Sequence, residues 1–387
     1  MGFLPPFRAW AEVNLDSLVH NYKELSKAAA SARVMCVVKA NAYGHGAVIC
    51  AKKLEQAGCT QFGVATLEEA IELRKGGIRS KILLLNHLDI NRIRDALDEN
   101  IDLTVFSLEL AKAISDKVKK TANVHLKLDT GLNRIGFKPH DAVEKISKIN
   151  ALPNINIEGV FTHYASTFAK DTAFTEFQTG VFKQICDELT NAGINVGIKH
   201  AANSAAVIRH PKTHFDMVRI GISLYGCYPF DDFEKTDVKL LPCMQLKASI
   251  NRVIDLGTGE SVSYGGLFVT ERLTRLATIP IGYADGVCAV LTGKLEVLVN
   301  GQNAPVVGKI CMDQCMIDVT DVEGEVEVGD EVVIFGEQKG GFIPVEQPAG
   351  QIGTINYEML CLVSRRVPRY YTENRVIVTK EDFSGNF

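Results

Sequence analysis

The strongest constraint on the fold is a repeated alternation of short β-rich runs and amphipathic helical segments, which extends over about 200 residues. The β-rich runs begin near Arg33, Phe62, Ile82, Leu103, Val124, Ile155, Val196 and Phe215. A capping-box sequence from Thr66 to Glu69 opens one of the helical segments. Eight units of this kind predict an α/β fold, a (β/α)8 barrel of the TIM type. A doubly wound open sheet is the alternative, although it usually has fewer strands.

The pattern changes after residue 240. Short β-rich runs then lie between Gly, Asn and Asp turns, at 249–254, 275–279, 295–299 and 331–335. They predict a mainly β C-terminal domain over 241–387, with a helix near 355–363. An alternating run around Glu12 reads as a strand, and Asp16 is expected to cap the helix that follows. We expect residues 1–12 to join the β domain and residues 13–240 to form the barrel.

Composition narrows the class of protein. The 387 residues carry a formal net charge of −4 without a basic patch, which argues against nucleic acid or an anionic membrane as partner. The ten cysteines do not have the spacing of a disulfide framework, and the one close pair, Cys311 and Cys315, has no histidine nearby, so we expect no metal. The first residues lack an apolar stretch of signal-peptide length, and no run is long enough to span a bilayer. We therefore expect a cytoplasmic protein.

A lysine stands at the end of the first barrel strand. Residues 37–46 form a β-branched run that reaches Lys39 and then breaks into a turn rich in small residues and glycine. A lysine at the C-terminal end of a buried strand loses hydration, and this loss favours the neutral amine. Such a site suits Schiff-base chemistry.

Other polar side chains gather where the predicted strands end, which is where a barrel places its active site. They are Asn41 and Tyr43 after the first strand; Lys127, Asp129 and Arg134 after the fifth; Thr162 and His163 after the sixth; His200, Asn203 and Ser204 after the seventh; and Arg219, Gly221 and Ile222 after the eighth. The Ser204 hydroxyl and the open backbone at Gly221 suit a phosphate in the last two loops. An imine-forming lysine together with a phosphate site suggests pyridoxal 5′-phosphate (PLP).

Local sequence also allows structural roles for most of these residues. Lys39 could simply extend to solvent, and His163 could be a hydrogen-bonded core histidine. Arg134 could be a turn residue paired with Asp129. Tyr264 and Tyr283 could be ordinary aromatic turn residues. Arg219 is different because it lies in an apolar run, 217–220. A buried guanidinium must find acceptors, since leaving it unpaired costs several kcal/mol.

Taken together, these motifs resemble those of the bacterial alanine racemases, a family of fold-type III PLP enzymes. Residues 37–46 are similar to the PLP-lysine signature of that family, and the resemblance continues to residues 366–371. It includes residues 129–137, 263–265, 281–286, 311–314 and 353–358. The resemblance implies interconversion of L-alanine and D-alanine, which supplies D-alanine for cell-wall peptidoglycan.

The resemblance also implies a role for each site residue. Lys39 would hold PLP as an imine and act as the base on the D-alanine face, and Tyr264 of the second subunit of a homodimer would be the opposing base. Arg219 would bind the pyridine nitrogen, with His163 against the ring. The remaining cofactor residues would be Tyr43, Asn203, Ser204, Gly221, Ile222 and Tyr357. Arg134 and the Met312 amide would bind the substrate carboxylate, Lys127 would carry a carbamate that fixes Arg134, and Tyr283 would narrow the entrance.

Three other functions remain open at this point. A racemase for serine or with broad specificity would differ only in pocket width. A fold-type III decarboxylase of basic amino acids would place an acidic residue on the pyridine nitrogen, where this chain has Arg219. A non-catalytic PLP carrier would lack the region after residue 244.

Overall fold

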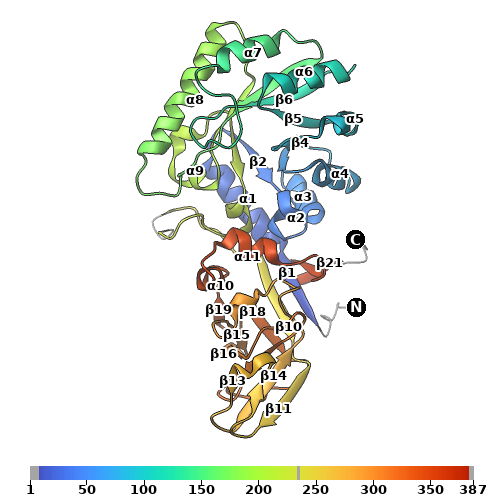
Figure 1. The fold of residues 1–387 in the computed structure, drawn as a ribbon, viewed down its shortest axis with the longest axis vertical. Helices are drawn as coiled ribbons and strands as arrows, with labels where there is room; N and C mark the ends of the chain where they lie inside the picture. The colour runs from blue at the N-terminus through green and yellow to red at the C-terminus, as the bar shows by residue number, and fades with distance from the viewer. Residues whose placement is uncertain (1–7, 233–235, 383–387) are drawn as a thin grey trace. The chain divides into compact units, whose positions relative to one another are not determined.

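In the computed structural model, which describes residues 8–232 and 236–382, eight parallel strands close into a barrel (Figure 1). They are β2 (Arg33–Val37), β3 (Gln61–Val64), β4 (Lys81–Leu84), β5 (Ile101–Val105), β6 (Ala122–Lys127), β7 (Ile155–Phe161), β8 (Ile198–His200) and β9 (Met217–Ile220). The first strand pairs with the last, with Arg33 opposite Met217 and Cys36 opposite Ile220. The predicted barrel is confirmed, and this closing pair excludes the doubly wound alternative.

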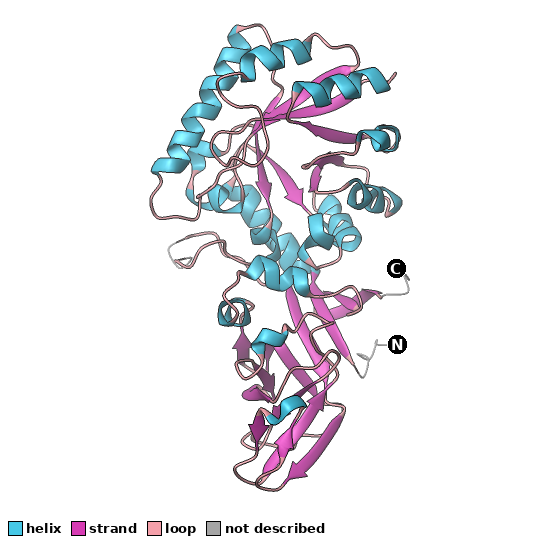
Figure 2. Cartoon of the chain, viewed as in Figure 1, coloured by secondary structure: helices cyan, strands magenta, loops and turns pink. Residues whose placement is uncertain are grey.

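Helices follow the barrel strands, as Figure 2 shows. They are α3 (Ala47–Gln56), α4 (Leu67–Lys75), α5 (Ile93–Asp98), α6 (Leu108–Lys117), α7 (Ala142–Asn150), α8 (Ala173–Asn191) and α9 (Ser204–Arg209), and α1 (Leu15–Ala28) precedes the first strand. The predicted capping box is present at Thr66 and Glu69. The predicted cap at Asp16 is wrong, because α1 begins at Leu15 and the Ser17 N–H donates to the Asn14 side chain at 2.9 Å.

Apolar side chains fill the inside of the barrel. Met35, Leu83 and Met217 form a buried cluster from three different strands, and Leu85 and Ile198 pack against it. Because burial of such side chains contributes about 1.5–3 kcal/mol each, this packing fixes the strands that carry the polar residues at their ends.

The rest of the described chain is mainly β. Its large sheet contains β1 (Ala9–Asn14), β10 (Met244–Ser249), β11 (Arg252–Leu256), β14 (Thr274–Ile279), β15 (Glu296–Val299), β16 (Gln302–Val307), β17 (Cys315–Asp318), β18 (Glu331–Gln338), β19 (Gly341–Ile343), β20 (Arg369–Glu373) and β21 (Val376–Glu381). The short strands β12 (Ser261–Val262) and β13 (Phe268–Val269) pair with each other, and the helices are α10 (Glu346–Gln351) and α11 (Asn356–Leu362). β1 lies between β10 and β20.

The described chain forms two compact units, each with its own packing. The barrel unit contains residues 18–42 and 47–241. The β unit contains the described residues up to 17, residues 43–46 and the described residues from 242 onward. Within the described ranges, the helices all fall short of the length and apolarity that crossing a membrane requires.

The short segment 43–46 belongs to the β unit because it packs tightly there. Gly46 has φ +94°, and a Cβ at this position would lie 1.7 Å from the Tyr371 hydroxyl oxygen. That hydroxyl is fixed by its own bond to Glu381, at 2.7 Å. Gly46 is therefore required both for its backbone conformation and for space.

We expect Gly46→Ala to lower the free energy of unfolding more than Gly340→Ala. Both glycines have φ +94°, but no atom lies within 4 Å of a Cβ placed at Gly340. Left-handed strain of about 1–2 kcal/mol is common to both variants, whereas overpacking adds about 1–3 kcal/mol at Gly46 alone. Urea unfolding followed by circular dichroism measures the difference. If both variants lost the same unfolding free energy, the Tyr371 side chain would have to move away from the new methyl group without cost.

Candidate active site at the carboxyl end of the barrel

Lys39 begins an unusual turn. It opens α2 (Lys39–Tyr43) directly after β2, and Ala40, Asn41, Ala42 and Tyr43 all have positive φ angles of 52° to 54°. Left-handed helical geometry costs an L-residue about 1–2 kcal/mol, so four such residues in succession store considerable strain. Strain of this kind persists only where the surrounding structure fixes it, and it concentrates at functional sites.

Glu69 and Asn41 help to fix this turn. One carboxylate oxygen of Glu69 accepts a bond from the Ala40 N–H at 2.7 Å, and the other accepts from the Ala65 N–H at 2.7 Å. The Asn41 side chain accepts from the Ala47 N–H at 2.8 Å. The capping box was predictable from sequence, but the contact of Glu69 with the lysine turn was not, because it joins segments 29 residues apart.

Arg219 lies in β9 with only 5% of its surface exposed. Its guanidinium donates to the carbonyl oxygens of His200, Thr162 and Ala201 at 2.8–3.0 Å. It also lies 3.0 Å from Nδ1 of His200 and 3.2 Å from Nδ1 of His163. Within the described ranges, these bonds use the two terminal nitrogens and leave Nε available. Burial lowers the pKa of Arg219 to about 10, so the group remains a cation near neutral pH.

The cation affects the histidines around it. Burial, followed by the charge of Arg219, lowers the pKa values of His163 and His200 well below the ordinary value. Burial, Lys81 and Arg219 together lower the pKa of His125 to about 3. These three imidazoles are therefore neutral near neutral pH.

Lys127 is a second buried basic residue at the ends of the barrel strands. It is 3% exposed, and its Nζ lies 4.7 Å from the centroid of the Phe161 ring. Burial and then the charges of Arg219 and Arg134 lower the pKa of Lys127 well below its usual value. Burial therefore favours the neutral, nucleophilic form of this amine over the ammonium ion.

The structure rejects the ion pair considered for Arg134. Asp129 accepts instead from Lys138 at 2.8 Å and from the backbone N–H groups of Gly131 and Asn133 at 3.1 and 2.9 Å. These bonds shape the turn that carries Arg134, which is exposed. An exposed arginine on a rigid turn is suited to bind an anion.

The residues predicted to hold a phosphate lie in the loops after the last two barrel strands. Ser204 begins α9, and its hydroxyl oxygen accepts from the Gly221 N–H at 2.9 Å. Ile222 follows at the start of a 3₁₀ turn, Ile222–Tyr225. The Asn203 side-chain oxygen caps α9 by accepting from the Ala206 N–H at 3.0 Å and also accepts from the Thr167 hydroxyl at 2.9 Å, and its contact with a cofactor stays a prediction. Asn203 therefore supports the turn that presents Ser204.

The other predicted site residues lie in the β unit. Tyr264, Tyr283 and Met312 are exposed by 71%, 46% and 51%. They stand on what we call the three-loop cluster, formed by residues 262–266, 281–286 and 309–314. The loops are joined by bonds from Tyr283 N–H to the Cys311 carbonyl at 3.0 Å and from the Ser263 hydroxyl to the Lys309 carbonyl at 2.8 Å.

Asp285 anchors this cluster, a role that sequence analysis missed. It is fully buried and accepts from the Gly282 N–H at 3.0 Å and from Arg8 and Arg366 at 2.7 Å each. Arg366 also pairs with Asp313 and so ties two of the three loops together. The sequence did not indicate this role, because its partners Arg8 and Arg366 lie far from Asp285 along the chain.

Tyr43 and Tyr357 lie together within the β unit. Their ring centroids are 6.1 Å apart, and Tyr43 is 8% exposed. Burial raises the pKa of the Tyr43 phenol above its usual range, so the phenol keeps its proton near neutral pH.

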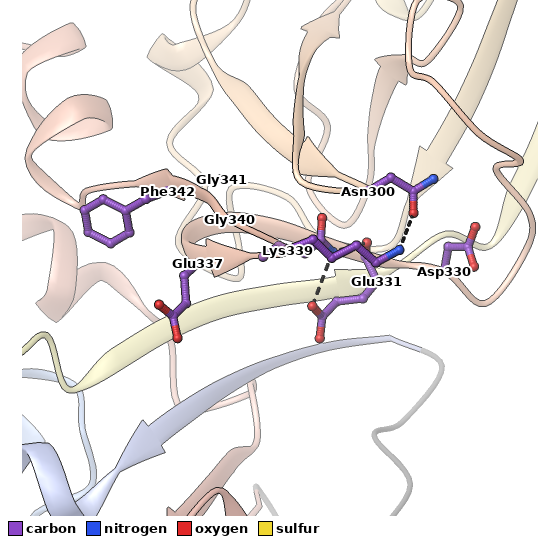
Figure 3. Close-up of a pocket in the computed structure, with 9 residues that line it drawn as sticks. Asn300, Asp330, Glu331, Glu337, Lys339, Gly340, Gly341 and Phe342 are labelled. Atoms are coloured by element: carbon purple, nitrogen blue, oxygen red, sulfur yellow. Dashed lines mark hydrogen bonds between the residues drawn. The ribbon is translucent and has the colours of Figure 1, made fainter.

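A separate hollow of about 720 Å³ lies in the β unit, lined by residues of β18 and its neighbours (Figure 3). Its polar groups largely bind one another: Lys339 donates to Asn300 at 2.9 Å, and Gln338 donates to the Glu331 side chain at 3.3 Å (Figure 3). It contains none of the predicted site residues, and we assign the chemistry to the barrel end.

The fold and the site define a class of protein. A (β/α)8 barrel with a lysine and a buried arginine at its carboxyl end, in a chain that also forms a β unit, is an enzyme framework. The model of the alanine racemase N-terminal domain matches residues 13–229, and that of the C-terminal domain matches residues 243–371.

Individual proteins agree with these matches. The alanine racemase of Clostridium novyi is 41% identical over 378 residues, covering 97% of this chain and 98% of its own length. The alanine racemase of Clostridium difficile has a TM-score of 0.93 and 40% identity, covering 98% of this chain and 99% of that one. The alanine racemase of Bacillus anthracis, solved with bound L-Ala-P, has a TM-score of 0.93 and 33% identity, covering 99% and 100%. The chain belongs to the alanine racemase family.

The neutral histidines predict how stability depends on pH. The unfolded chain protonates His125 below its ordinary pKa of 6.5, whereas the folded protein does so only near pH 3. The unfolded state therefore binds more protons in this window, and stability is lost as pH falls through it. One such proton is worth about 1.4 kcal/mol per pH unit.

We expect His125→Asn to reduce the slope of the unfolding free energy against pH below pH 6.5. The reduction should be about 1.4 kcal/mol per pH unit, which corresponds to one proton. Urea unfolding at a series of pH values measures this slope in both proteins. An unchanged slope would mean that the buried imidazole already carries its proton in the folded state.

Proposed function

We propose that this chain interconverts L-alanine and D-alanine, with PLP bound at the carboxyl end of its barrel and with Lys39 and Tyr264 as the two bases. The observation that carries the proposal is Arg219, a buried guanidinium whose acceptors are carbonyls and imidazoles and whose Nε is left over. Family membership supports the reaction, and the site geometry supports the cofactor.

The residues present suit PLP. It requires an amine, a phosphate site and a partner for its ring nitrogen. Lys39 supplies the amine. Ser204 and the backbone at Gly221 and Ile222 would hold the phosphate, together with the hydroxyls of Tyr43 and Tyr357. When bound, PLP supplies an electron sink for the charge that forms on the α-carbon of an amino acid.

Arg219 sets the strength of that sink. A guanidinium has only donors and does not give up its proton in this range, so its Nε would leave the ring nitrogen unprotonated. The sink is then weaker than it would be with an acidic partner, which restrains transamination. The same argument disfavours a decarboxylase of basic amino acids. His163, held on Arg219 at 3.2 Å, would pack against the ring as a neutral imidazole.

Racemisation requires a base on each face of the α-carbon, because a proton removed from one face must be returned to the other. Lys39 would take the proton of D-alanine, and Tyr264 would take the proton of L-alanine. Tyr264 is 71% exposed and stands on the three-loop cluster, together with two other exposed side chains of apolar character. We propose that this cluster meets the barrel end of a second copy, so that a homodimer holds two complete sites.

The substrate carboxylate would bind to Arg134 and to the Met312 amide of the partner subunit. Tyr283, bonded to the loop of Met312, would narrow the entrance. Small amino acids fit this arrangement, and pocket width would decide between alanine alone and alanine with serine. The ten free thiols fit a reducing compartment, and we place the enzyme in the cytoplasm, where D-alanine would serve cell-wall peptidoglycan.

The two-base assignment has a direct test. Tyr264→Phe should lower α-proton exchange of L-alanine in deuterated water by at least about 100-fold, because loss of a general base costs about 10²- to 10⁴-fold. Exchange of D-alanine, which uses Lys39, should remain and is the internal control. NMR of the α-position measures both.

Wild-type protein must racemise L-alanine, and Lys39→Ala must abolish both the reaction and covalent cofactor binding. If Tyr264→Phe exchanged both enantiomers at the wild-type ratio, Tyr264 would not be a base. Bound cofactor without any racemisation would point to a carrier or a decarboxylase.

Lys127 is expected to be a carbamate. Its neutral amine would attack the carbon of dissolved carbon dioxide, forming the N–C bond while one C=O electron pair moves to oxygen and a proton leaves the nitrogen. The product is an anion, which would fix Arg134 by a charge-assisted bond, whereas an ammonium would repel it.

Protein equilibrated with ¹³C-bicarbonate should show one carbamate carbon resonance, and this resonance should be missing in Lys127→Met. Lys81→Met, which replaces a more exposed lysine, should retain it. A wild-type spectrum identical to that of Lys127→Met would exclude the modification.

A further inference from the structure

The imidazole next to Arg219 has a defined protonation pattern. A guanidinium can only donate, so Nδ1 of His200, at 3.0 Å from the Arg219 terminal nitrogen, must be the acceptor. His200 is neutral and therefore carries its single proton on Nε2. The orientation of this proton follows from geometry alone.

The pattern continues to a second histidine. Nε2 of His200 lies 2.9 Å from Nδ1 of His125, so the His200 proton points at that nitrogen. His125 must then carry its own proton on Nε2, which lies 4.0 Å from Oδ2 of Asp102. Arg219, His200 and His125, from β9, β8 and β6, thus form a chain in which each shared proton points away from Arg219. Asp102 of β5 lies beyond the chain, at a distance longer than a hydrogen bond.

Packing allows only this arrangement of rings. His125 and His200 are 1% and 0% exposed, and the Phe161 ring stacks on His200 at 4.7 Å between centroids with 7° between planes. Gly159 makes room for the second ring, because a Cβ there would lie 2.5 Å from His125 Nδ1. The absence of a side chain at Gly159, within β7, therefore leaves space for the His125 ring.

We propose that His125 is a positioning residue for the reaction, acting through His200 on Arg219. By accepting the Nε2 proton of His200, His125 increases the basicity of His200 Nδ1, as outer hydrogen-bond partners do for other imidazoles. The bond to Arg219 is then stronger, and the guanidinium keeps its Nε in a fixed direction. Asp102 lies beyond the outer end of the chain, 4.0 Å from Nε2 of His125. The inference rests on the proposed role of Arg219 toward the ring nitrogen of PLP.

The first test measures the histidine tautomers of the wild-type protein and does not depend on an activity assay. In cofactor-free wild-type protein, two-bond ¹H–¹⁵N correlation spectra should show His125 and His200 as neutral rings protonated at Nε2, with assignments taken from single-histidine variants. A proton on Nδ1 of either ring, or a mixture of tautomers, would overturn the inference. This result is independent of whether the protein racemises alanine.

The second test compares two variants of nearly equal shape. In His125→Asn, the side-chain oxygen takes the place of Nδ1 and can accept the His200 proton, whereas His125→Leu fills the same space without an acceptor. We expect kcat to fall about tenfold in the Leu variant relative to the Asn variant, the lower end of what losing an outer hydrogen-bond partner costs. KM for alanine should be equal in the two, and the Leu variant should release more pyruvate per racemisation event.

Equal kcat and equal pyruvate release in the two variants would overturn the inference. If the Leu variant failed to fold, the tautomer spectrum of the wild type would decide the question. If the wild type had the expected tautomers but no racemase activity, the proposed function would fail while the hydrogen-bond chain itself stood.

Discussion

The structure depends on how one positive charge is buried. Arg219 lies at the carboxyl end of the barrel, and within residues 8–232 and 236–382 its hydrogen-bond partners include no carboxylate, so carbonyl oxygens and imidazole lone pairs stabilise it. A carboxylate would neutralise the guanidinium but would also supply a place for a proton. Neutral acceptors leave a permanent cation whose protons are all fixed in direction. An unpaired buried guanidinium would cost several kcal/mol, and each of the five contacts offsets part of that cost.

The other unusual protonation states at this end follow from that charge and from burial. The same cation lowers the pKa values of Lys127 and of the nearby histidines, so the uncharged forms of these groups are favoured around the buried guanidinium. A neutral lysine can react as a nucleophile, and a neutral imidazole can accept a hydrogen bond. Both properties would be lost if a second cation formed next to Arg219.

The sequence predicted the elements well and the contacts between them less well. Strand periodicity located the barrel, and residues at strand ends, such as Lys39 and Ser204, were identified because a barrel places its site there. Glu69 was predicted only as a cap, because its contact with the lysine turn is non-local. Arg134 was considered a partner of Asp129, but Lys138 occupies that carboxylate. His125 was not predicted, because nothing in local sequence shows which inward-facing residues meet across a barrel.

The turn after Lys39 has a consequence for the order in which the protein is made. The Gly44 carbonyl oxygen accepts a hydrogen bond from the Arg369 side chain at 3.0 Å. Arg369 is synthesised 325 residues after Gly44. At about 5–20 residues per second, this partner is synthesised tens of seconds after the lysine. The first barrel strand can form early, but the segment that follows the lysine lacks this partner until residue 369 has been synthesised. A chain that ends before Arg369 therefore lacks one of the bonds that hold this turn, and the surroundings of the lysine are complete only after that residue is made.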